Sequence, residues 1–145
     1  MRVLPFVTVD GSSAAFAFHE RPIDLVHLAR TTLGDPSLEG EMLEAFGLKA
    51  SLLILRMQQA ARFGLKASLL ILRMQQAARS SICAAAQALK GSARGIGAWR
   101  IASAAEAVEL VAASGAEPEL RSALDRLGVV AEETRAAIAE LLQGN

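Results

Sequence analysis

The sequence predicts an all-α protein, an antiparallel up-down four-helix bundle preceded by a short leading helix. Two features of the composition favour this fold: 52% of the residues are hydrophobic, with many alanines and leucines, and prolines number only 4. The third feature is positional, because several segments repeat apolar residues at spacings of three and four. With 145 residues, the chain has the length of one domain with its own hydrophobic core.

The leading helix and the second helix are separated by clear end signals. Helical spacing begins at Pro22 and ends at Gly34, a residue typical of helix C-termini. Asp35 then provides an N-cap, and Pro36 lies in the first turn of the second helix. The apolar stripe predicted for the leading helix consists of Ile23, Leu25, Val26 and Leu33.

Three more helices are expected further along the chain. The first begins at a cap formed by Ser80 or Ser81 and contains "ICAAAQALKGSARGIG". The next, "AWRIASAAEAVELVAAS", ends at Gly115, and Pro118 opens the last helix. Both of these later helices carry apolar residues on one face. Those residues are Ile101, Ala105, Val108 and Ala112, then Leu120, Leu124, Leu127, Ala131, Thr134, Ile138 and Leu141.

Residues 1–20 differ in character from the rest of the chain. The stretches "VLPFVTV" and "AAFAF" flank "DGSS", which is compatible with a hairpin that turns at Asp10-Gly11. An isolated hairpin is only marginally stable, so an arm laid on the bundle or a disordered tail remains an alternative. The predicted organisation is an N-terminal arm or tail, residues 1–20, and one helical domain, residues 21–145.

A 17-residue segment occurs twice in tandem without a single change. Residues 46–62 and 63–79 both read "FGLKASLLILRMQQAAR". Seventeen residues turn an α-helix by about 1700°, roughly 100° short of five turns, so one continuous helix would present the two apolar stripes on different faces. One copy should therefore fill the bundle, while the other projects, folds back after a break near Gly64, or packs on another chain. We expect a domain-swapped or otherwise associated homodimer.

Charge and composition restrict the classes of function. The formal net charge is zero, with 15 basic and 15 acidic residues, so general nucleic-acid binding is not expected. The single cysteine, Cys83, fits a reducing cytoplasm and a small buried apolar role. Apolar runs are too short for a membrane span, and no export signal is recognised. Neither His19 nor His27 lies at ligand spacing to a cysteine or an acidic cluster, so no metal site is expected.

The segment of residues 84–99, "AAAQALKGSARGIGAW", resembles the active helix of histidine-containing phosphotransfer (Hpt) domains. The family pattern is H-x-x-K-G-S, followed by small residues and another glycine. The family histidine falls on Gln87. The matching positions are Lys90, Gly91, Ser92, Gly95 and Gly97.

The resemblance extends over about residues 21–142, apart from the extra copy of the 17-residue repeat. "RPIDLVHLARTTLGD" is similar to the leading helix of alphaproteobacterial members, "EMLEAF" to the start of their second helix, and "GAWRIASAAEAVE" to their fourth. The resemblance implies a four-helix bundle that works in a two-component phosphorelay, receives a phosphoryl group from the aspartate of a receiver domain and passes it on. It implies no cofactor for the chain itself, because Mg²⁺ in such transfers is held by the receiver.

Helical spacing places position 87 beside Lys90 and Gly91. An imidazole at position 87 would be the phosphoryl nucleophile, Lys90 would offset charge on the phosphoryl oxygens, and Gly91 would admit a partner's active site. The amide of Gln87 is not a nucleophile at neutral pH, so we expect no catalytic residue and no enzymatic turnover. The residues predicted to bind a partner are Gln87, Lys90, Gly91, Ser92 and Arg94. His27 is followed by Arg30 but lacks the glycine, and is expected on the helix surface or in a groove.

Three hypotheses of function follow. The first is a pseudo-Hpt domain that docks a receiver domain or a histidine kinase without accepting phosphate. The second is an active phosphotransfer protein whose histidine has been replaced by Gln87. The third is a degenerate helical protein that acts only by self-association through the duplicated segment.

Overall fold

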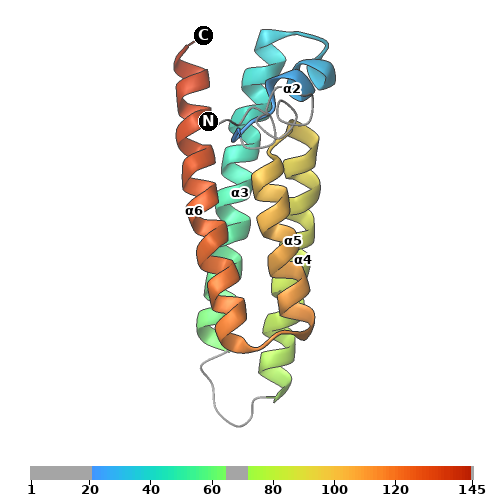
Figure 1. The fold of residues 1–145 in the computed structure, drawn as a ribbon, viewed down its shortest axis with the longest axis vertical. Helices are drawn as coiled ribbons and strands as arrows, with labels where there is room; N and C mark the ends of the chain where they lie inside the picture. Colours follow the sequence, from blue (N-terminus) through green and yellow to red (C-terminus); the bar gives the residue numbers. More distant parts are fainter. Residues whose placement is uncertain (1–20, 65–71, 145) are drawn as a thin grey trace, which may run out of the picture.

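This computed structural model describes residues 21–64 and 72–144, and all of the regular secondary structure within them is α-helical (Figure 1). The helices are α2 (Leu25–Thr32), α3 (Pro36–Gly64), α4 (Leu72–Ile96), α5 (Trp99–Ser114) and α6 (Glu117–Gln143). The all-α prediction is confirmed. The predicted arm or hairpin of residues 1–20 lies outside the described residues.

Helices α3 to α6 lie side by side, and consecutive ones run in opposite directions (Figure 1). Each long helix packs on the next one in the sequence, α3 also packs on α6, and α2 covers one end by contacting α3 and α4. Their facing sides enclose one hydrophobic core, in which each buried large apolar side chain contributes roughly 1.5–3 kcal/mol. The largest fully buried apolar side chains are Leu28, Met57, Ile82, Leu89, Ile101, Val108, Leu120 and Leu127.

The leading helix differs from its prediction in both its start and its buried face. It begins at Leu25 rather than Pro22, because Asp24 is its N-cap, and it ends at Thr32. Leu33 adopts a left-handed conformation with φ of 56° and is 93% exposed. Leu25 and Val26 are also exposed, so the predicted stripe was wrong at three of its positions. Leu28 and Thr32, four residues apart, provide the buried face instead.

Hydrogen bonds of Asp24 connect α2 to the turn between α4 and α5. Its Oδ1 accepts a hydrogen bond from the backbone N–H of His27 (3.1 Å), and its Oδ2 accepts one from Nε1–H of Trp99 (2.8 Å). The backbone N–H of Asp24 donates to the carbonyl oxygen of Gly97 (2.9 Å). Gly97 has φ of +81°, and a Cβ there would lie 3.0 Å from the Cβ and carbonyl oxygen of Asp24. The close approach of α2 therefore requires glycine at this position.

The two copies of the repeat occupy different places in the fold. The first copy forms the second half of α3 and faces the core, and α3 ends at Gly64. The end of the second copy forms the first turns of α4, which begins at Leu72, so Ser80 and Ser81 lie inside the helix and do not cap it as predicted. The buried residues of the first copy are Phe46, Ala50, Leu53, Ile54, Met57 and Ala61.

Arg79, the last residue of the second copy, binds the C-terminal end of α5. Its Nη1 donates to the carbonyl oxygens of Ala112 (3.1 Å) and Gly115 (2.9 Å), which no intrahelical N–H satisfies. Its positive charge also complements the negative end of the α5 dipole. Arg62, the same residue of the first copy, is exposed on α3. Tertiary position therefore gives the same side chain two different roles.

The two later helices agree with the prediction. Helix α5 ends at Ser114, before Gly115, and α6 begins at Glu117 with Pro118 in its first turn. All four positions predicted for the core face of α5 are buried. On α6, the predicted face is buried except at Ala131 and Leu141, which are half-buried.

Replacing Arg79 with Met should lower the free energy of unfolding by about 1–2 kcal/mol, because the last carbonyl groups of α5 lose a charged donor. Chemical denaturation would measure the change. The matched control is Arg56→Met, at an exposed arginine of α3, which should change the stability by less than about 0.5 kcal/mol. Equal effects of the two substitutions would contradict the role of Arg79.

Asp24 should make the stability depend on pH. Partial burial raises the pKa of this carboxyl, but hydrogen bonds from Trp99 and from the N–H of His27 outweigh burial, so the pKa is lowered. A lowered folded-state pKa stabilises the fold above the unfolded-state value of about 4, and this stabilisation is lost as the pH falls through the folded-state pKa. The stability difference between the wild type and Asp24→Asn should therefore shrink on acidification. A constant difference from neutral pH to pH 3 would contradict this account.

Candidate functional site

Gln87 lies exposed on the outward side of α4, nine residues before the helix ends at Ile96. Its orientation follows from the opposite side of the helix, where Ala86, Leu89 and Ala93 are completely buried. Because these apolar side chains fix the rotation of α4 about its axis, the side chain of Gln87 points into the solvent. The structure thus places Gln87 on an accessible surface.

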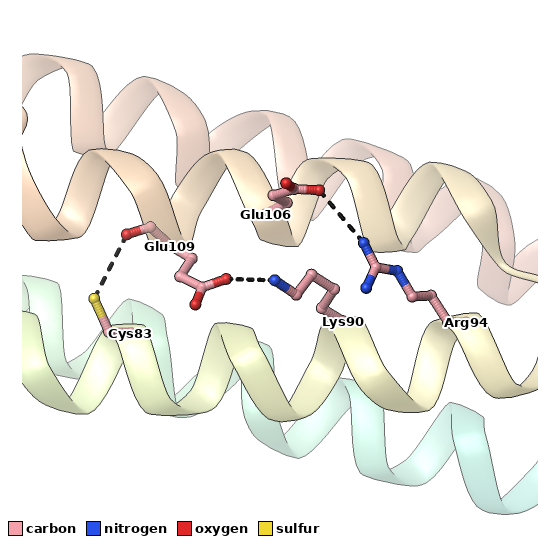
Figure 2. Close-up of polar contacts among 5 residues, drawn as sticks. All are labelled: Cys83, Lys90, Arg94, Glu106 and Glu109. Carbon is pink, nitrogen blue, oxygen red and sulfur yellow. Dashed lines mark hydrogen bonds and ion pairs between the residues drawn. The ribbon is translucent and has the colours of Figure 1, made fainter.

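Lys90 extends across to α5, as Figure 2 shows. Its Nζ lies 2.8 Å from Oε1 of Glu109, and the two side chains are only 19% and 24% exposed. An ion pair with this degree of burial is screened less than an open surface pair. The ammonium group of Lys90 is therefore neutralised by α5 and does not stand alone beside Gln87.

Arg94 and Glu106 form a second ion pair between α4 and α5, one turn beyond the first (Figure 2). Their closest N–O distance is 3.6 Å, and each side chain is about half exposed. A pair of this kind contributes about 0–1 kcal/mol and exchanges readily for an external partner. The two pairs together leave this surface electrically balanced, with alternating basic residues on α4 and acidic residues on α5.

Because Gly91 and Gly95 have no side chains, nothing projects from α4 at these two positions near Gln87. Both are exposed, and a Cβ added at either would meet nothing within 4 Å. No internal packing explains either glycine, since a side chain at each would point into open space. A partner's backbone can therefore approach α4 closely at this point.

Ser92 does not belong to this face. Five residues turn a helix by about 500°, which places Ser92 roughly 140° around α4 from Gln87. It is half-buried. The structure therefore brings together Gln87, Lys90, Gly91 and Arg94 along one side of α4, with Glu106 and Glu109 added from α5. The two glutamates were missed by sequence reasoning, although their i, i+3 spacing on the predicted helix places both on one face.

Cys83 lies on the same side of α4, two turns before Lys90 (Figure 2). Its thiol donates a weak hydrogen bond to the carbonyl oxygen of Glu109 over 3.5 Å. Cys83 was predicted to be buried, and the structure shows it half-buried. Burial, followed by the negative charge of Glu109, raises the pKa of the thiol. Cys83 is therefore a packing residue and not an activated nucleophile.

His27 packs against Trp99 and lies apart from the Gln87 surface. It is half-buried on α2, with its ring edge-on to Trp99 at a centroid distance of 4.9 Å. Trp99 is half-buried and donates its indole N–H to Asp24.

Across residues 21–64 and 72–144, no three His, Cys, Asp or Glu side chains are placed to hold a metal ion.

A separate groove of about 390 Å³ lies between α3 and α6, outside the Gln87 face. Three of the residues that line the groove are small, namely Gly47 and Ala50 on α3 and Gly128 on α6. Phe46, Ile54 and Ile138 line it with apolar surface. None of the residues predicted to bind a partner contributes to it.

Comparisons with protein-family models, with curated proteins and with solved structures find no match to this chain. Among the described helices, none combines the length and the apolar character that crossing a membrane requires.

Replacing Glu109 with Gln should lower the pKa of the Cys83 thiol, because a negative charge that opposes thiolate formation is removed. The pH dependence of Cys83 alkylation by iodoacetamide would measure this as faster reaction at mildly alkaline pH. Glu106→Gln is the control, because Glu106 pairs with Arg94 and not with the region of Cys83. Identical alkylation profiles for Glu109→Gln and the wild type would contradict the assignment.

Proposed function

We propose that this chain is a pseudo-Hpt domain, in which α3 to α6 form an antiparallel four-helix bundle of the Hpt type. In this proposal the surface around Gln87 docks a receiver domain or a histidine kinase of a cytoplasmic phosphorelay and does not accept a phosphoryl group. The support comes from the motif resemblance and from the geometry of α4.

The observation that carries the proposal is the position of Gln87. The side chain is exposed on a long helix, with open glycine surface at Gly91 and a cation at Lys90 within one turn. This arrangement suits close approach by another protein. A glutamine amide offers hydrogen bonds similar to those of a neutral imidazole but has no nucleophilic lone pair.

The ion pairs of the surface also favour docking over phosphate capture. Stabilising a phosphoryl group requires uncompensated positive charge near its oxygens. Here Glu109 neutralises Lys90 at 2.8 Å, and Glu106 lies 3.6 Å from Arg94. A balanced surface of this kind provides specificity for a partner's charges more than affinity for a free anion.

Binding to an unphosphorylated receiver domain tests the docking surface. Gly91→Gln should weaken binding by at least about tenfold, because the new side chain occupies the space a partner must enter. Gly47→Gln is the matched control, since its added side chain also meets nothing within 4 Å but lies on α3. Titration calorimetry with a panel of receivers would measure both. Equal affinities for the two variants would contradict docking at Gln87.

Phosphoryl transfer separates the pseudo-Hpt proposal from an active Hpt protein. Incubation with a phosphorylated receiver should leave the wild-type chain without an acid-labile label, because Gln87 offers no nucleophile. Appearance of such a label at position 87 of the wild type would overturn the proposal. In Gln87→His, regained transfer would indicate recent loss of the histidine, and its absence would indicate a domain adapted to docking alone.

A further inference from the structure

We infer that the outward face of α3 is the interface of an antiparallel homodimer. Seven residues at intervals of three or four occupy this face, and we call them the α3 stripe. All seven are exposed. They are Glu41, Glu44, Leu48, Leu52, Leu55, Gln59 and Arg62. Intervals of three and four keep them on one side of the helix, as in the seam of a two-stranded coiled coil.

The centre of the α3 stripe leaves large apolar side chains in water. Leu48, Leu52 and Leu55 are 71%, 62% and 49% exposed. They lie opposite the side of α3 that faces the core, where Leu53 and Met57 are buried. The core therefore does not use these three leucines, and burial against a second surface would be favourable for each of them.

The order of residues along the α3 stripe indicates which partner would fit it. Acidic residues lie at its N-terminal end, leucines at its centre, and an arginine at its C-terminal end. A two-fold axis between positions 51 and 52 pairs Glu41 with the partner's Arg62, and Leu48 with the partner's Leu55. It also places Glu44 opposite the partner's Gln59. A parallel pairing would instead set Glu41 against the same residue of the partner, and like charges repel.

Such a self-complementary pattern is what a two-fold symmetric interface requires, since the same patch serves both subunits. Neither Glu41 nor Arg62 forms an ion pair within the described part of its own chain. Their charges are therefore available at both ends of the seam. A second copy of the chain is the partner that matches all of these features.

The second copy of the repeat does not offer an equivalent stripe. The positions that correspond to the two glutamates are Gln58 and Ala61, so the acidic end is missing. The position that corresponds to Arg62 is Arg79, which is engaged with the carbonyl groups at the end of α5. The complete pattern thus occurs once per chain. The inference concerns α3 and is independent of docking on α4.

Molar mass measured by light scattering over a range of concentrations tests the inference with the full chain. The wild type should show twice the mass of one chain, and Leu52→Lys should be monomeric, because it places a charge at the centre of the apolar seam. The matched control is Val129→Lys, because Val129 is an apolar residue on α6 that is 61% exposed. Circular dichroism would verify that each variant keeps its helical content. A monomeric wild type, or a Leu52→Lys dimer, would overturn the inference.

Exchange of the end charges tests the antiparallel arrangement. Glu41→Arg and Arg62→Glu should each weaken the dimer about tenfold, because each places like charges at both ends of the seam. The double variant Glu41→Arg with Arg62→Glu should restore wild-type dimerisation, since it re-forms both pairs with reversed sign. Failure of the double variant to recover would overturn the antiparallel pairing, and insensitivity to all three variants would overturn the interface on α3.

Discussion

The close packing of α4 against α5 is the interaction on which the rest of the structure depends. Alanines with no exposed surface lie on the facing sides of both helices, among them Ala86, Ala93 and Ala105. Small side chains let two helix backbones approach, so that groups on one helix reach the other. This proximity allows Lys90 to pair with Glu109 and Arg79 to bind the last carbonyl groups of α5. The balanced surface around Gln87 is thus a consequence of how the core is packed.

The tandem repeat shows how strongly tertiary context acts on identical sequence. In the first copy, the segment continues α3, buries one apolar stripe and leaves a second stripe of leucines in water. In the second copy, its last residues begin α4, and Arg79 serves as a C-terminal cap for α5. Both uses satisfy local helix propensity equally well. The difference lies in which neighbours each copy meets after α3 ends at Gly64.

Two outward surfaces with different chemistry result from this arrangement. The surface around Gln87 on α4 is polar, its basic and acidic side chains are paired, and no side chain projects at Gly91 or Gly95. These properties suit specific docking. The α3 stripe is apolar at its centre and charged at its ends, which is suited to pairing with a copy of itself. Because the two surfaces belong to different helices, the proposed docking surface and the proposed dimer interface are separate, and each can be tested without altering the other.

The sequence by itself determined the helical class, the end of α5 and the start of α6, and the placement of Gln87, Lys90 and Gly91 along one side of a helix. These depend on local signals, namely residue spacing, Gly115 and Pro118, which act within a few residues. Only the tertiary structure decided that α4 begins before Ser80 and that Leu25 and Leu33 are exposed. It also decided that Glu109 neutralises Lys90, because that pair joins residues 19 positions apart on two packed helices. Local spacing fixes which side chains share a face, whereas the packing of one helix on another decides what each face contacts.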